Sequence, residues 1–171
     1  MTEYTIIFCI ASDKHFLLVE KDKPEWQKGK LNLPGGKIEP GETPIQCANR
    51  ELAEESGLCG DNTVHYMKQL GRIVDNNVTI HCMWCCTSYS SKLKLRPADS
   101  ETQKIGWYDW DTVRRDRRLI PNLRLIIPLM LAGQNGWCIE DHDTGFDKEE
   151  HKMTISVPGG MCKNEVLGIL G

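Results

Sequence analysis

The stretch from residue 36 to residue 58, GKIEPGETPIQCANRELAEESGL, restricts the fold more than any other part of the chain. It contains the signals that open and close a helix. Thr43 can cap the free backbone amides, Pro44 suits the first helical position, and Gln46 can complete a capping box. Gly57 supplies the stop, because glycine adopts the left-handed conformation that ends many helices. The sequence therefore predicts a helix between Pro44 and Gly57.

The predicted helix has one acidic face. Glu51, Glu54 and Glu55 stand at positions i, i+3 and i+4, so their carboxylates point the same way. Three close like charges need cations, and Mg²⁺ takes oxygen ligands from one or two carboxylates together with substrate phosphates. Arg50 can pair with Glu54 across one turn. A second face carries apolar residues that would anchor the helix on a core, namely Ile45, Ala48 and Leu52.

The spacing around this helix extends into a long motif. Gly36 is followed after five residues by Glu42, and after seven more by RELAEESGL, which runs from Arg50 to Leu58. Every defined position matches the Nudix box, so the chain resembles the Nudix hydrolase superfamily on 23 of its 171 residues. The resemblance implies an α/β fold, the Nudix α/β/α sandwich, with a mixed β-sheet between the box helix and a second helix.

The remaining sequence has the order that such a fold needs. Residues 111–118 are typical of a short polar helix, and residues 121–133 predict the second main helix, in which Pro128 favours a kink or a break. Five segments have the residue types and the alternation of strands, namely residues 4–10, 15–20, 63–74, 77–89 and 105–110.

The C-terminal residues 137–171 go beyond a minimal domain of this kind. Residues 137–141 and 152–157 can pair as a hairpin, after which residues 158–160 turn the chain toward a short apolar tail. By length, residues 1–171 predict a single domain, which the resemblance implies is a Nudix hydrolase domain with this extension packed on it. The extension carries no motif and is compatible with a monomer or a homodimer.

The resemblance also implies metal and substrate contacts outside the helix. The Gly35 carbonyl would bind a metal ion, and Lys37 would meet a phosphate unless it is a solvated lysine. Asn32 and Asn122 stand where some nucleotide-cleaning relatives keep base-reading asparagines, although Asn32 also suits a strand-end turn and Asn122 aligns only with a gap. Trp26 would either pack as a lid or stack on a base.

A further carboxylate is expected in the polar loop at residues 92–104. Many Nudix enzymes keep a metal ligand or general base shortly before the aromatic strand that follows such a loop. Glu101 is the first candidate for that role and Asp99 the second, with an ordinary acidic loop as the alternative.

Together these residues predict hydrolysis of a phosphoanhydride in a nucleoside diphosphate linked to another group. Mg²⁺ or Mn²⁺ would be held by the Gly35 carbonyl and by Glu51, Glu54, Glu55 and Glu101. Either Glu51 or Glu101 would take the proton of the attacking water, while Arg50 orients a glutamate.

Specificity signals for other Nudix substrates are not evident after the box, which favours a MutT-type (d)NTP pyrophosphohydrolase that yields a nucleoside monophosphate and pyrophosphate. ADP-ribose, nucleotide sugars, dinucleoside polyphosphates and RNA caps stay open as substrates, as does a nucleotide sensor without activity.

Composition narrows the partners and the compartment. The net charge is −3, so no basic surface for binding nucleic acid is expected, and an RNA 5′ end is the one nucleic-acid partner left open. No apolar run is long enough to span a membrane. A cytoplasmic protein is expected. Cys82, Cys85 and Cys86 lie beside His81, but they lack a second ligand pair at zinc spacing. Buried thiols are the favoured interpretation.

Overall fold

A mixed β-sheet forms the centre of the computed structural model, which describes residues 1–58, 64–75, 77–88, 95, 104–132, 135–141, 150–157 and 160–169. Within these residues the sheet has nine strands. In chain order they are β1 Thr2–Ala11, β2 Phe16–Glu20, β3 Leu31–Asn32, β4 His65–Asp75, β5 Val78–Thr87, β6 Lys104–Tyr108, β7 Trp137–Asp141, β8 Glu150–Val157 and β9 Gly160–Ile169. The described helical segments are η1 Glu25–Gln27, α1 Pro44–Ser56, α3 Trp110–Val113 and α4 Leu123–Leu131.

The strand order is β3-β2-β1-β5-β4-β7-β8-β9, with β6 paired to β2. Strands β1 and β5 run parallel over their whole length, and β4 and β7 are also parallel, while the other pairs are antiparallel. Parallel neighbours need a crossover connection, and helix α1 supplies part of the one between β1 and β5. The mixed sheet predicted from the sequence is thereby confirmed.

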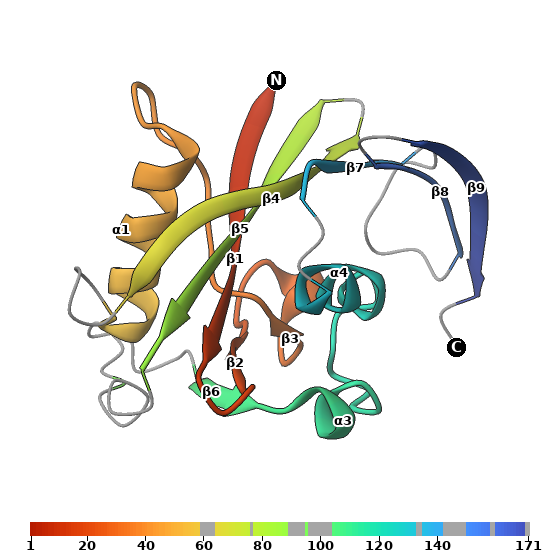
Figure 1. Cartoon of the computed structure of the whole chain (residues 1–171). Coiled ribbons are helices and arrows are strands. Elements are labelled where there is room, and N and C mark those ends of the chain that lie inside the picture. The colour runs from red at the N-terminus through yellow and green to blue at the C-terminus, as the bar shows by residue number, and fades with distance from the viewer. Residues whose placement is uncertain are drawn as a thin grey trace.

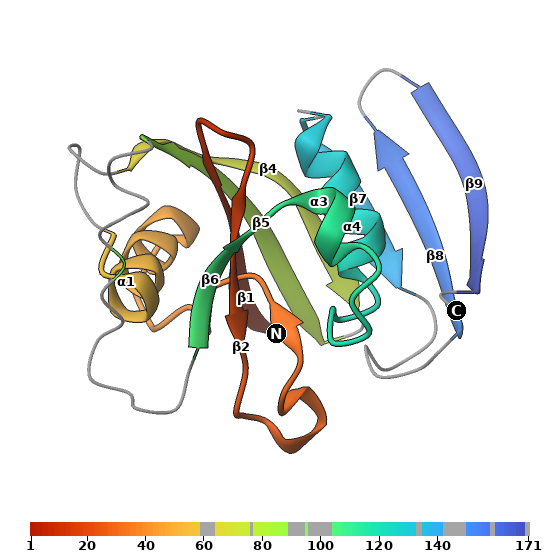
Figure 2. The ribbon, with the colours of Figure 1, turned by 90° about the horizontal axis from the view of Figure 1, so that it is seen from below.

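Helices cover both faces of this sheet. Helix α1 lies on one side of strands β1, β5 and β4 and helix α4 on the other, as Figure 1 and Figure 2 show. Residues of alternating parity along each strand serve the two faces. Ile7 and Cys9 of β1 pack toward α1, whereas Phe8 packs toward α4. The α/β/α sandwich expected from the sequence is therefore present.

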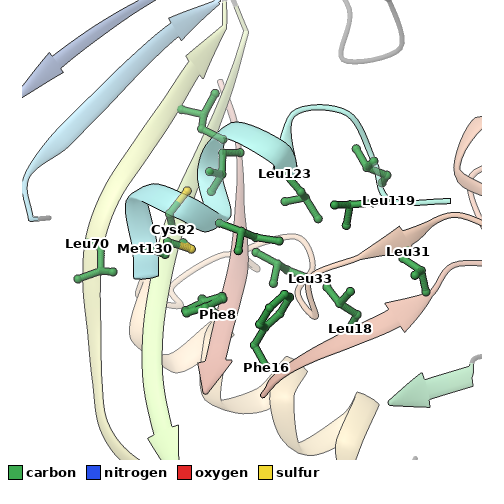
Figure 3. Packing of buried hydrophobic residues seen from close by; sticks show 14 of the residues in the cluster. Phe8, Phe16, Leu18, Leu31, Leu33, Leu70, Cys82, Leu119, Leu123 and Met130 are labelled. Atoms are coloured by element: carbon green, nitrogen blue, oxygen red, sulfur yellow. The ribbon is translucent and has the colours of Figure 1, made fainter. Parts of the chain in front are cut away.

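The core on the α4 side is built from aromatic and aliphatic side chains that interdigitate (Figure 3). The rings of Phe8 and Phe16 stand 5.2 Å apart and join strands β1 and β2. Leu123 and Met130 reach down from α4 onto this layer. The helix is thus held by one apolar face, as its sequence pattern requires.

Several details differ from the sequence prediction. Helix α4 continues through Pro128 to Leu131, so the proline does not break it. Residues 160–169 form strand β9, which pairs antiparallel with β8 and is not merely an apolar tail. Ile45 is 47% exposed and does not anchor α1, because helical periodicity assigns a face but not the point where the packing partner ends. The smaller Cys47 is buried in that first turn instead.

The hairpin predicted for residues 137–141 and 152–157 is confirmed. Strands β7 and β8 are antiparallel, with Cys138 opposite Ser156, and β7 joins the sheet through its parallel pairing with β4.

Among the residues that the structure describes, no helix is long and apolar enough to cross a membrane.

Candidate active site

Residues 34–38, which include Gly35 and Gly36, run antiparallel beside strand β1. The Thr5 amide donates to the Gly36 carbonyl at 2.9 Å, and the Ile7 amide donates to the Pro34 carbonyl at 2.8 Å. Gly35 has a φ of +144°, and a β-carbon there would overlap the carbonyl of Thr5. Only glycine fits at this position, because both the conformation and the space exclude a side chain.

Helix α1 brings its glutamates to Gly35 and Gly36. Thr43 and Gln46 form the reciprocal capping box predicted from the sequence, and Gly57 ends the helix with a φ of 73°. Ala48 and Leu52 are buried against the sheet, which sets the rotation of the helix about its axis. Packing on the opposite side therefore directs the acidic face toward Gly35 and Gly36.

Glu51 and Glu55 both contact the glycine pair. A β-carbon on Gly36 would overlap the Glu51 carboxylate, so that carboxylate lies directly against Gly36. Glu55 Oε2 accepts a hydrogen bond of 2.9 Å from the Gly35 amide. The side chains of Glu51 and Glu55 are 15% and 12% exposed, whereas Glu54 is 56% exposed. Two of the three predicted carboxylates are thus largely withdrawn from water.

Arg50 fastens the acidic cluster to the loop before the helix. Its guanidinium forks onto Glu42, with Nε 2.9 Å from Oε1 and a terminal nitrogen 3.0 Å from Oε2. It also donates to Glu51 at 2.7 Å, to Glu54 at 3.3 Å and to the backbone carbonyl of Lys37 at 3.2 Å. These contacts are what an orienting residue requires, because the planar fork fixes each carboxylate it touches.

Burial and hydrogen bonding shift the pKa values of these acids in opposite directions. Burial raises the pKa of the Glu51 carboxyl above its usual value, and nearby Glu55 and Glu54 add to the rise, although bonding from Arg50 opposes it. Hydrogen bonding from Arg50 instead lowers the pKa of the Glu42 carboxyl from 4.5 to about 2. Glu42 therefore behaves as a permanent anion that holds Arg50, and Glu51 as a carboxylate whose charge is incompletely compensated.

Lys21 is a member of this site that sequence reasoning did not indicate. Its ammonium nitrogen lies 2.5 Å from Glu55 Oε1, and its side chain is 10% exposed. The signal was present in the strand before it. Leu17 packs toward α1, and continuing its alternation through Val19 places Lys21 on the same face.

The donor set suits a hard divalent cation. Carboxylate oxygens and a backbone carbonyl are the ligands that Mg²⁺ and Mn²⁺ take. The partly buried Glu51 and Glu55 supply negative charge beside Gly35 and Gly36. Within the described part of the chain, no group of three or more acidic, His or Cys side chains is already placed to hold a metal ion. Arg50 and Lys21 hold the carboxylates instead. The residues present fit the ion by chemistry and by charge.

A cavity of about 330 Å³ opens on the α4 side of strand β1. Three residues predicted to bind substrate line it, namely Trp26, Asn32 and Asn122. Asn32 Nδ2 donates to Gln27 at 3.1 Å, and its Oδ1 accepts from the Leu33 amide at 2.8 Å. The buried Oδ1 of Asn122 has no hydrogen-bond partner within the described residues. Sequence reasoning missed Gln27 and the apolar wall, to which Tyr4, Ile73 and Leu123 contribute.

The other predicted site residues are less defined. Lys37 is exposed, and its backbone rather than its ammonium contacts Arg50. Glu101 and Asp99 lie outside the described residues. Cys82 and Cys85 are buried free thiols in the clusters on opposite faces of the sheet, and burial raises the pKa of the Cys82 thiol. His81 meets Gln69 and Glu3 rather than a cysteine in the contacts that the structure defines.

Comparison with known proteins gives consistent matches. A model of the NUDIX domain matches residues 2–130. The oxidized purine nucleoside triphosphate hydrolase of Danio rerio is 32% identical over 116 residues, which cover 67% of this chain and 71% of that protein. The 8-oxo-dGDP phosphatase NUDT18 of Mus musculus is 28% identical over 107 residues, or 61% of this chain, and the match spans only 32% of that relative.

A solved structure shares the fold along nearly the whole chain. The mutator MutT protein of Bacillus halodurans superposes with a TM-score of 0.65 at 18% identity, and the match covers 91% of this chain and 98% of that one. At this identity the likeness concerns the fold alone.

Proposed function

Since this chain belongs to the Nudix hydrolase family and is a pyrophosphohydrolase, we propose that it converts nucleoside triphosphates to the monophosphate and pyrophosphate with Mg²⁺ or Mn²⁺. The proposed preference is for purine bases, oxidised ones included. This reaction requires the phosphoanhydride bond to lie beside the acidic cluster while the base occupies a separate site.

One observation carries this proposal: Asn32 in the cavity wall and Gly35 beside the acidic cluster are only three residues apart in the chain. Asn32 lines the cavity, and Gly35 donates its amide to Glu55. Three residues of extended chain span about 10 Å at most. A base in the cavity can therefore leave its phosphates beside Glu51 and Glu55, which is the reach that a nucleotide needs.

The chemistry of the cavity favours a nucleobase. Its wall is largely apolar, and Trp26 is a partly exposed ring on which a flat ring can stack. The unpaired Oδ1 of Asn122 needs a donor from the ligand, because a buried acceptor without a partner is unfavourable. Purine N–H and amino groups supply such donors. The names of the zebrafish and mouse relatives, which refer to oxidised purine substrates, support the same class.

The residues of this chain have distinct roles in the proposed reaction. A water oxygen attacks phosphorus, the bond to the bridging oxygen breaks, and pyrophosphate leaves. Glu51 or Glu101 accepts the proton of the water. Arg50 holds Glu51 and Glu54 in place through its guanidinium. Glu51, Glu54, Glu55 and the Gly35 carbonyl, together with Glu101, would hold a divalent ion, which would supply charge neutralisation for the phosphates.

The test is a hydrolysis panel with the products identified by mass. Ordinary and oxidised (d)NTPs are compared with ADP-ribose, dinucleoside polyphosphates, nucleotide sugars and capped RNA, with Mg²⁺ or Mn²⁺ and with chelator. We expect monophosphate and pyrophosphate from purine triphosphates, no turnover with chelator, and severe loss in Glu51→Gln and Glu54→Gln. A higher kcat/KM for ADP-ribose or a dinucleotide would overturn the substrate class while leaving the metal site intact.

The base site has its own variant. Asn122→Ala should raise KM for the preferred purine triphosphate by about tenfold, which is the loss of one hydrogen bond of about 1.4 kcal/mol. Asn77→Ala, in an exposed turn, is the matched control and should leave KM unchanged. An equal KM in the two variants would remove Asn122 from the base site.

A further inference from the structure

Lys21 is held beneath the acidic cluster by its backbone as well as by its side chain. Its amide donates to the Lys30 carbonyl at 2.9 Å, and its carbonyl accepts from the Gly29 amide at 2.8 Å. The residue is only 9% exposed. Its Cα is thus fixed at the end of strand β2, while the four-carbon stem leaves the ammonium free to take more than one position.

Both oxygens of the Glu55 carboxylate already have partners. Oε1 lies 2.5 Å from the Lys21 ammonium, and Oε2 accepts from the Gly35 amide. A carboxylate that is 12% exposed requires such compensation, because a buried charge without a partner is strongly unfavourable. The ammonium therefore neutralises Glu55 in the metal-free protein.

This arrangement conflicts with a divalent cation at the same carboxylate. A cation bound to Glu55 would lie within a few ångströms of the lysine nitrogen, and like charges at that separation repel strongly where water is scarce. We propose that Lys21 is an internal counter-ion that competes with the divalent cation for Glu55 and leaves Oε1 when the metal binds. The inference rests on the proposed metal-dependent function and assigns to Lys21 an effect on the affinity of Glu55 for the metal.

Metal affinity tests the competition directly. Mn²⁺ binding is measured by calorimetry and by electron paramagnetic resonance for chelator-treated wild type, Lys21→Met, Lys21→Arg and Lys28→Met. Lys28 is exposed in the same loop, so Lys28→Met makes the same change in net charge away from the site. We expect Lys21→Met to bind Mn²⁺ about tenfold more tightly, which corresponds to 1.4 kcal/mol of removed competition. Lys28→Met should match wild type, and Lys21→Arg, which keeps the charge, should not bind more tightly.

The same change should act oppositely on the metal-free protein. Without the ammonium, Glu55 is left largely buried and without its counter-ion, so Lys21→Met should melt at a lower temperature than wild type in chelator. Saturating Mn²⁺ should then raise its melting temperature by more than it raises that of wild type. Wild-type or weaker Mn²⁺ affinity in folded Lys21→Met would contradict the proposal.

A second measurement uses unaltered protein and does not depend on the folding of a variant. An amine-reactive reagent is applied with and without saturating Mn²⁺, and labelling at each lysine is quantified by mass spectrometry. Lys21 should be protected in chelator and should label faster with Mn²⁺, because its ammonium has left Glu55. Lys28 should label equally in both conditions. Labelling of Lys21 that does not change with Mn²⁺ would overturn the displacement.

These outcomes separate the inference from the function on which it rests. If wild type binds Mn²⁺, Glu51→Gln weakens that binding and Lys21→Met does not change it, the metal site stands and the role of Lys21 is wrong. If wild type binds no Mn²⁺ at all, both the metal-dependent function and the competition are wrong.

Discussion

Two adjacent glycines serve different purposes, and their substitution should separate folding from metal binding. At Gly35 a side chain would meet the Thr5 backbone and require a φ of +144°, so Gly35→Ala should lower the free energy of unfolding by about 2 kcal/mol or more. At Gly36 the obstacle is the movable end of Glu51. Gly36→Ala should stay near wild-type stability but weaken Mn²⁺ binding by about tenfold, the usual effect of disturbing a ligand orientation.

Urea unfolding and Mn²⁺ titration of the two glycine variants check this prediction. Equal losses of stability in both proteins would show that the backbone of residues 35–36, and not the Glu51 carboxylate beside it, determines both effects.

Glu42 and Glu51 share Arg50 but should give opposite pH dependences of stability. The pKa of Glu42 is lowered to about 2, so its contribution is present above the ordinary value of 4.5 and is lost as the pH falls toward 2. The pKa of Glu51 is raised, so its contribution is fully present below 4.5 and is lost as the pH rises through the folded-state value. Glu42→Gln should therefore destabilise the protein at neutral pH, and Glu51→Gln should stabilise it there.

Melting temperatures of the metal-free proteins, from about pH 3 to about pH 8, measure both effects. The difference from wild type should shrink for Glu51→Gln as the pH falls toward 4.5, and for Glu42→Gln as the pH falls from 4.5 toward 2. A Glu51→Gln protein that melts below wild type at neutral pH would show that the bond from Arg50 outweighs burial.

At the scale of the element, helix α1 depends on its first turn. The Thr43 hydroxyl accepts from the Gln46 amide at 3.3 Å, and Gln46 Oε1 accepts from the Thr43 amide at 2.8 Å. Thr43→Ala should lower the free energy of unfolding by about 1 kcal/mol, because amides of the first turn lose a partner. Thr43→Ser keeps the hydroxyl and should cost much less. Urea denaturation measures the difference, and equal losses would mean that the hydroxyl does not stabilise the helix.

The elements differ in how far sequence predicts them. Helix α1 was predicted correctly because its start and stop signals, Thr43 and Gly57, act within a few residues. Burial along the helix was partly wrong at Ile45, since it depends on how far the sheet extends. The pairing of Lys21 with Glu55 joins residues 34 positions apart and was not predicted. Periodicity indicates a face, but distances across the fold decide which side chains meet.

The candidate cavity shows the same division. Asn32 and Asn122 were proposed from a resemblance, each from its local position, and the structure places both in one cavity wall. The apolar part of that wall comes from strands β1, β4 and β5 and from α4. Such convergence of distant elements has no signature in a short sequence window, so the volume and shape of the cavity could not be predicted.

At the scale of the whole molecule, the joint between strands β4 and β7 decides whether residues beyond the matched domain fold with it. Gly71 of β4 stands opposite Trp137 of β7, and a β-carbon on Gly71 would overlap the indole ring. Trp137 is 1% exposed and belongs to the core that also contains Phe8 and Leu123. The family match ends at residue 130, so this ring ties a strand outside the match to the centre of the sheet.

A double-mutant cycle tests that tie. Gly71→Ala should lower the free energy of unfolding by about 1–3 kcal/mol, because a methyl group is forced against a closely packed ring. In a Trp137→Leu background the smaller side chain leaves room for the methyl group, so the same substitution should be neutral or stabilising. Urea denaturation of the four proteins gives the coupling free energy, which should be of that size for residues in contact. If Gly71→Ala costs the same in both backgrounds, Trp137 does not pack on β4. Strong coupling would instead show that β7 unfolds together with the sheet that carries the acidic cluster, and that the cooperative unit extends past residue 130.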